Sequence, residues 1–181
     1  ATTEIYTLSL HDALPFFIGK YLAAVIFVTI TLALTFPLWI TVNYLGDPDN
    51  GIILTGYVGS LLMAAGFLAI GAFISALTKN QVVAFVMTTA VCFVLIASGA
   101  PIVLSLFSGW APKFLIEFIA SLSFLTHYAD ISKGVLDLRD AIYFLSVITV
   151  FLVANMLRSE EHTSELQSLV NLVCRLLLEK K

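Results

Sequence analysis

Charged side chains are scarce in this chain of 181 residues. Asp, Glu, Lys and Arg together make up 12% of the sequence, whereas soluble domains carry roughly 25%. Hydrophobic residues make up 60%, and the mean hydropathy is +1.01. The formal net charge is −3, so the chain lacks the excess of basic residues with which proteins bind nucleic acid. This composition predicts an integral membrane protein with no nucleic-acid partner.

Cysteine is rare, and the motifs of common enzymes are absent. The two cysteines, Cys92 and Cys174, provide neither a disulfide framework nor the spacing of a metal site. The sequence has no G-x-x-x-x-G-K-[ST] loop for ATP, no H-E-x-x-H and no G-x-S-x-G motif. We therefore expect no catalytic, cofactor-binding or metal-binding residues in this chain, and no enzymatic activity of its own.

Four long stretches contain no charged side chain. They cover residues 21–42, 52–78, 81–106 and 141–157, and a helix needs about 20 apolar residues to cross the hydrocarbon core of a bilayer. The stretches are too long for the strands of a membrane barrel, and their hydrophobic residues do not alternate. We therefore expect an all-α, polytopic membrane helix bundle with about four spanning helices. Pro37 and Pro101 should kink these helices or end them early.

Two lysines indicate the orientation of the bundle. Lys20 precedes the first stretch, and Lys79 lies between the second and the third. Positively charged loops favour the cytoplasm. We therefore expect both lysines inside, and the turn Gly46–Gly51 and the loop 107–140 outside. The chain would be a multi-pass protein of the cell (inner) membrane, surrounded by the lipid bilayer.

Small residues recur at every fourth position of the second stretch. Gly56, Ser60 and Ala64 form one series, and Gly71 and Ser75 form another. Small side chains on one face let helix backbones approach each other closely in lipid. We expect these residues to pack the second helix against its neighbours.

The loop 107–140 is more polar than the stretches around it. Its segment 114–129 is apolar but too short to cross the bilayer, so we expect short re-entrant or interfacial helices in this external loop. Glu117 should face protein or water, because a charge exposed to lipid is costly. His127 and Asp130 lie three residues apart and can share a helix face. Two ligands make a poor metal site, so this spacing favours a hydrogen-bonded or ion-paired contact.

The end of the same loop carries a cluster of charged residues. Its members are Lys133, Asp137, Arg139 and Asp140. We expect a solvated or locally paired cluster that positions the last span, with Arg139 able to pair with Asp137 or Asp140.

The two ends of the chain differ in composition from the middle. Ala1–Pro15 and Arg158–Lys181 match, codon by codon, the translations of two short-read sequencing adapters. We expect both segments to be sequencing artefacts, which leaves residues 16–157 as the protein proper. The alternative is a genuine amphipathic tail at the C-terminal end, since its leucines recur at helical spacing.

Three segments of the middle resemble the permease subunits of ABC-2-type transporters. They are Gly19–Phe27, Gly46–Phe85 and Leu122–Leu152. The likeness is strongest to the branch of gliding-motility-associated or multi-drug-type permeases. Two patterns carry it: G-x-x-x-S-x-L-T-x-N-Q-x-x-A-F at Gly71–Phe85, and H-Y-x-x-I-x-x-G-V-x-D-x-R-D-x-x-Y-F at His127–Phe144.

The resemblance implies a larger assembly. Such permeases have about six spanning helices, pair with a second permease subunit as a homo- or heterodimer, and are driven by cytosolic ATPase subunits that bind ATP and Mg²⁺. Residues 16–157 would then be a fragment of an ABC-2-type transmembrane domain without its first span and coupling helix. Lys79, Asn80 and Gln81 would form a cytoplasmic turn near the ATPase. The external gate region would contain Glu117, His127, Asp130, Asp137, Arg139 and Asp140.

Taken together, these features predict the permease component of an ATP-driven exporter. Within the four stretches no ionisable side chain occurs apart from Cys92 and tyrosines, whereas ion-coupled transporters usually need ionisable groups at mid-membrane. Two alternatives stay open: a membrane scaffold or anchor that does not transport, and a secondary transporter whose ion site lies in the missing part. No residue indicates the substrate.

Overall fold

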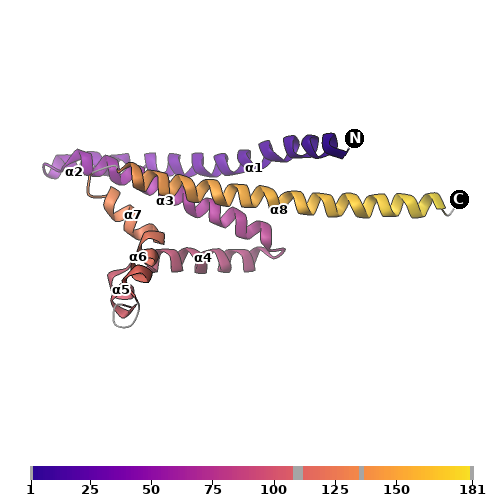
Figure 1. Ribbon diagram of the computed structural model, residues 1–181. Coiled ribbons are helices and arrows are strands. Elements are labelled where there is room, and N and C mark those ends of the chain that lie inside the picture. Colours follow the sequence, from indigo (N-terminus) through magenta and orange to yellow (C-terminus); the bar gives the residue numbers. More distant parts are fainter. Residues whose placement is uncertain (1, 108–111, 135–136, 180–181) are drawn as a thin grey trace.

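The computed structural model describes residues 2–107, 112–134 and 137–179, with side chains described for 18–107, 112–134 and 137–158. Every regular element in these ranges is an α-helix, as the sequence predicts (Figure 1). The helices are α1 (Thr2–Ala33), α2 (Phe36–Leu45), α3 (Asn50–Leu77), α4 (Gln81–Ala97), α5 (Pro101–Phe107), α6 (Lys113–Leu122), α7 (Phe124–Ile131) and α8 (Leu138–Glu179).

Three segments of the described chain are long and apolar enough to cross a membrane. They are Ile18–Leu45, Asn50–Leu77 and Leu138–Arg158, with mean hydropathies of 2.2, 2.1 and 1.9. The pair α6 and α7, bent by 68°, would make a fourth if it crosses as one broken span. A membrane-embedded helix bundle is therefore confirmed in its general form.

The expected span over residues 81–106 is not continuous. Helix α4 ends at Ala97, and α5 begins at Pro101 after a break of three residues. A helix of 17 residues is about 26 Å long, shorter than the roughly 30 Å hydrocarbon core. Pro101 lacks an N–H and disfavours helical conformation at Ala100, so the helix ends before it.

Pro37 has a similar effect nearer the start of the chain. Helix α1 ends at Ala33, and α2 begins at Phe36, which places Pro37 in the first turn of α2. The missing N–H of a proline is harmless in the first turn, where it has no partner within the helix. The prediction that both prolines interrupt their helices is confirmed.

Helix α3 is the centre of the bundle. It packs against α8, α4, α1 and α7. Figure 1 shows the α2–α3 link and the start of α8 at one end of the bundle, and the α3–α4 turn at the opposite end. Helices α2, α3 and α4, which follow one another along the chain, therefore run in alternating directions.

The buried face of α3 is built around two glycines. A Cβ on Gly59 would lie 3.0 Å from Cγ2 of Ile131, and one on Gly66 would lie 3.1 Å from the ring of Phe124. Because both contacts are with α7, the two glycines let that short helix lie directly on α3. The fully buried side chains of Phe124 and Ile131 join Phe144 of α8 in the apolar core.

The small residues expected at helix contacts are distributed over more than one face of α3. The Ser60 hydroxyl lies 3.3 Å from that of Tyr128 on α7, and a Cβ on Gly71 would lie 3.3 Å from Thr88 on α4. In contrast, a Cβ on Gly56 would meet nothing within 4 Å, Ala64 is half-buried and Ser75 is exposed. The closest approaches therefore occur at Gly59 and Gly66, outside the predicted series.

Most of the apolar surface of the spans points away from the bundle. In the most apolar stretch of Ile18–Leu45 no residue is buried. The buried share of residues is 22% for Asn50–Leu77 and 17% for Leu138–Arg158. Exposed apolar area of this extent is unfavourable in water. The surface is suited to contact with lipid or with further helices.

Candidate functional site

A pocket of about 580 Å³ lies between α6, α7 and the start of α8. Its lining is formed by Glu117, Ala120, Ser121, Thr126, His127, Asp130, Lys133, Asp137, Arg139 and Asp140. The set includes all six residues that the sequence assigned to an external gate region, although they come from three helices and the links between them. The structure thus brings these six residues together around one cavity.

The bend between α6 and α7 shapes one wall of the pocket. Ser123 separates the two helices, and its hydroxyl accepts a hydrogen bond from the backbone N–H of Leu125 at 3.2 Å. The same hydroxyl donates to the backbone carbonyl of Leu95 on α4 at 3.1 Å. Ser123 therefore caps the start of α7 and ties the bend to α4.

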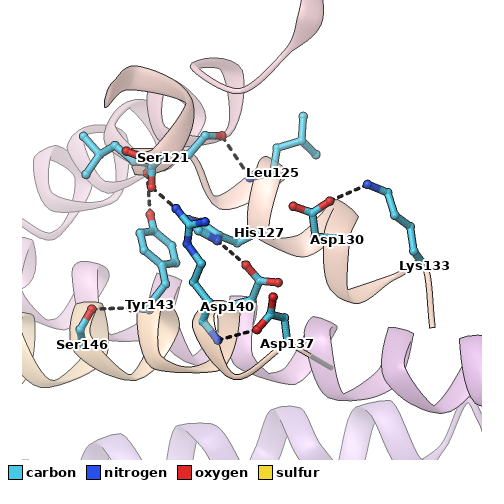
Figure 2. A network of polar contacts seen from close by, with 12 residues as sticks. Ser121, Leu125, His127, Asp130, Lys133, Asp137, Asp140, Tyr143 and Ser146 are labelled. Carbon is cyan, nitrogen blue, oxygen red and sulfur yellow. Dashed lines mark hydrogen bonds and ion pairs between the residues drawn. The ribbon is translucent and has the colours of Figure 1, made fainter. Parts of the chain in front are cut away.

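Two aromatic side chains cap the end of α6. His127 Nε2 donates to the carbonyl of Ser121 at 3.0 Å, and the Tyr143 hydroxyl donates to the carbonyl of Leu122 at 2.5 Å (Figure 2). The last carbonyls of a helix have no partner within it, so these contacts satisfy acceptors that would otherwise be left open. The two rings are stacked, with centroids 3.8 Å apart.

The central polar contact of the pocket joins α7 to α8. His127 Nδ1 lies 2.6 Å from a carboxylate oxygen of Asp140, and both side chains are buried, at 9% and 7% exposed. Figure 2 shows the His127 ring between Asp140 on one side and Ser121 on the other. The ring therefore contacts α6 and α8 while belonging to α7.

The sequence led us to expect a hydrogen-bonded or ion-paired interface at His127 and Asp130, and the structure gives each residue its own polar partner. Asp130 accepts from Lys133 at 2.5 Å, in an ion pair whose side chains are 50% and 71% exposed. Because α7 lies on α3, His127 falls on the covered face with Phe124 and Ile131. Asp130 instead points to the open side of the pocket.

The pairs considered for Arg139 are also different in the structure. A carboxylate oxygen of Asp137 accepts from the backbone N–H of Arg139 at 3.1 Å, and Asp140 is held by His127. Within residues 18–107, 112–134 and 137–158, neither the Arg139 guanidinium nor the Glu117 carboxylate forms an ion pair. These two groups line the pocket with their charges available to a ligand.

The arrangement offers charged groups of both signs to a polar molecule. Carboxylates and cationic groups line the same pocket. Among the residues whose side chains are described, no three His, Cys, Asp or Glu side chains lie close enough together to hold a metal ion.

The predicted cytoplasmic turn lies away from this pocket. Lys79, Asn80 and Gln81 are exposed at the α3–α4 turn, at the far end of α3 in Figure 1. The Asn80 side chain accepts from the backbone N–H of Val82 at 2.9 Å and so caps α4. Lys79 is thereby displayed at the tip of a well-defined turn.

Comparison of this chain with family models, curated proteins and solved structures found no match.

Proposed function

We propose that this chain is the transmembrane permease subunit of an ATP-driven exporter of the ABC-2 type. It forms part of the substrate pathway in the inner membrane and pairs with a second permease subunit. Separate cytosolic ATPase subunits bind ATP and Mg²⁺ and supply the energy. The support comes from the distribution of charge along the spans, from the polar pocket at one end, and from the resemblance of Gly71–Phe85 and His127–Phe144 to such permeases.

The distribution of charge is the observation that carries this proposal. In the three candidate spans, charged residues occur only near the ends: Lys20 in the first, and Arg139, Asp140 and Arg158 in the last. A transporter driven by protons or ions usually needs ionisable groups at mid-membrane. The lack of such groups at the middle of the three candidate spans favours energy supplied by a partner over ion coupling.

The pocket and the α3–α4 turn are given separate roles. The pocket between α6, α7 and α8 acts at the external gate, where Glu117 and Arg139 offer one negative and one positive charge to the leaving substrate. The turn with Lys79 faces the cytoplasm and receives the movement of the ATPase. The two features lie at opposite ends of the bundle (Figure 1), as a pathway across the membrane requires.

The test is reconstitution with the ATPase encoded beside the gene. The protein is expressed from its complete gene, placed in liposomes with that ATPase, and assayed for ATP hydrolysis and ATP-dependent export. We expect hydrolysis to rise several-fold when the permease is present. An ATPase rate that is independent of the permease would contradict the proposal, and transport driven by an ion gradient without ATP would indicate a secondary transporter.

A matched pair of variants tests the role of the pocket. Arg139→Gln removes a charge that lines the pocket, and Lys20→Gln removes a charge near the start of the first span, outside the pocket lining. We expect Arg139→Gln to lower the export rate while the complex with the ATPase still assembles, and Lys20→Gln to leave export nearly unchanged. Equal effects of the two substitutions would contradict a gate at this pocket.

A further inference from the structure

Among the described side chains of α7, only His127 forms hydrogen bonds to both α6 and α8 (Figure 2). Nε2 contacts the carbonyl of Ser121 at the end of α6, and Nδ1 contacts the carboxylate of Asp140 in the first turn of α8. We call the bent segment Lys113–Ile131 the α6–α7 elbow. This imidazole ring, together with the Tyr143–Leu122 hydrogen bond, therefore provides the described polar ties of the elbow to α8.

The two contacts require a definite number of hydrogen atoms. A carbonyl oxygen can only accept, so Nε2 must carry a hydrogen to bond Ser121. The contact between Nδ1 and Asp140 needs a second hydrogen, placed either on the ring or on the carboxyl group. The histidine and the aspartate together must therefore hold two hydrogens, one more than a neutral imidazole beside a carboxylate would have.

From this geometry we propose that the His127–Asp140 pair is a proton-controlled latch, which fastens the α6–α7 elbow to α8 while the shared proton is bound and releases it when that proton is lost. Without the proton, a neutral ring has a single N–H. If the N–H stays at Nε2, the lone pair of Nδ1 faces the Asp140 carboxylate; if it moves to Nδ1, the lone pair of Nε2 faces the Ser121 carbonyl. Either tautomer breaks one of the two contacts.

Acid and alkali should act differently on this latch. An added proton would produce an imidazolium beside a neutral carboxyl group, and Nδ1–H can still donate to the carbonyl oxygen of that group. Both hydrogen bonds then persist, although the ion pair does not. The latch is therefore expected to open when loss of the shared proton is forced by raising the pH, and to remain closed when the pH is lowered.

The other charged groups around the pair are engaged or lie further along the pocket. Glu117 is on α6, Asp130 and Lys133 pair with each other beside α7, and Asp137 and Arg139 precede Asp140 on α8. Tyr143 stacks on the ring and donates to Leu122. Helices α3 and α4, which also pack against α7, contain no Asp, Glu, Lys, Arg or His.

Release of the latch would leave the elbow few polar ties to α8. The Tyr143–Leu122 hydrogen bond remains, and Ser123 holds the bend to α4 rather than to α8. Because Ser123 keeps the bend tied to α4, we expect α6 to swing about this bend and so to widen the pocket. The latch is a property of helix positions and does not depend on the proposed transport.

The experiment measures the distance between α6 and α8 as a function of pH. Spin labels are attached to Phe118→Cys on α6 and Val150→Cys on α8, two positions that are 55% and 63% exposed. Cys92 and Cys174 are replaced, and the full chain is placed in lipid nanodiscs. Electron spin resonance then gives the distance between the labels, a readout that does not itself titrate.

The expected result is a closed distance at the low end of a pH series and a longer one at the high end, by at least about 5 Å, the rise of one helical turn. Asp140→Asn should hold the closed distance at every pH, because its amide donates to Nδ1 while Nε2–H bonds Ser121. His127→Phe keeps a stacked ring without hydrogen bonds and should be open at every pH. Glu117→Gln and Asp137→Asn should respond to pH like the parent.

Several results would overturn the latch. They are an unchanging distance in the parent chain, an Asp140→Asn variant that opens like the parent, or loss of the response in Glu117→Gln or Asp137→Asn. If circular dichroism shows that His127→Phe does not fold, the comparison of Asp140→Asn with the parent decides the question alone.

Discussion

At the scale of single residues, Gly99 occupies the tightest of the described glycine positions. It lies in the break between α4 and α5, where a Cβ would stand 2.1 Å from the Ser123 hydroxyl and 2.8 Å from that of Thr126. Ser123 is itself the break between α6 and α7 and is completely buried. The two interrupted helices thus meet at their interruptions, with no room for a side chain between them.

Gly99→Ala tests this contact. Since Ser123 is buried and held by hydrogen bonds, it cannot move aside, and the added methyl should lower the free energy of unfolding by about 1–3 kcal/mol, as overpacking does in other cores. Gly56→Ala is the control, because its methyl would meet nothing within 4 Å. We expect it to be neutral or to stabilise the helix by up to about 1 kcal/mol.

The measurement is reversible unfolding in mixed micelles, followed by circular dichroism. A Gly99→Ala variant as stable as Gly56→Ala would show that the two breaks are not packed as described.

The partner of His127 shows where residue-level prediction from sequence ends. Spacing along one helix suggested that His127 and Asp130 share a face, and that reasoning treats only neighbours on the same element. The actual partner, Asp140, is 13 residues away and follows a turn. Its approach depends on α7 lying on Gly59 and Gly66 of α3, a packing detail that local periodicity does not contain.

At the scale of helices, side-chain caps fix where several elements begin. The Asp49 carboxylate accepts from the backbone N–H of Gly51 at 2.8 Å at the start of α3, and Asn80 does the same for α4. The turn Gly46–Gly51, expected from its Asp, Pro and Gly content, therefore also sets the first residue of the central helix.

Asp49→Ala is expected to cost about 0.5–2 kcal/mol of stability, the usual effect of losing an N-cap. Asp47→Ala serves as the matched control, because Asp47 is exposed in the same link and forms no cap. The unfolding free energies of the two variants in mixed micelles provide the comparison. If both substitutions have the same effect, loss of charge rather than loss of the cap would be the cause.

The sequence predicted where the helices lie along the chain better than it predicted which face of each helix is buried. Long apolar runs and the two prolines located most spans and both interruptions, because the need to satisfy backbone groups in lipid leaves few options. The buried face of α3 was harder to identify. Small residues occur on several of its faces, and only the position of α7 selects Gly59 and Gly66 over Gly56.

At the scale of the whole molecule, alternating helices place the polar features at two ends. The α2–α3 link and the start of α8 lie at one end, and the α3–α4 turn lies at the other (Figure 1). This arrangement requires that Asp47 and Asp130 share one side of the membrane and that Lys79 faces the opposite side.

Single cysteines at these positions test the arrangement in cells. In a background without Cys92 and Cys174, we expect a membrane-impermeant maleimide to label Asp47→Cys and Asp130→Cys from outside. Lys79→Cys should react only after the membrane is permeabilised, because positively charged turns favour the cytoplasm. Labelling of all three from the same side would contradict the bundle as described.

The contacts of the elbow with α8 have a consequence for synthesis of the protein. The span Ile18–Leu45 buries none of its residues in the bundle, so it can enter lipid as soon as it leaves the ribosome. The elbow cannot settle so early, because the partners of His127 and of the Leu122 carbonyl, Asp140 and Tyr143, have not yet been translated. Until α8 emerges these groups need water, which keeps the elbow at the membrane surface and makes its docking a late step of biogenesis.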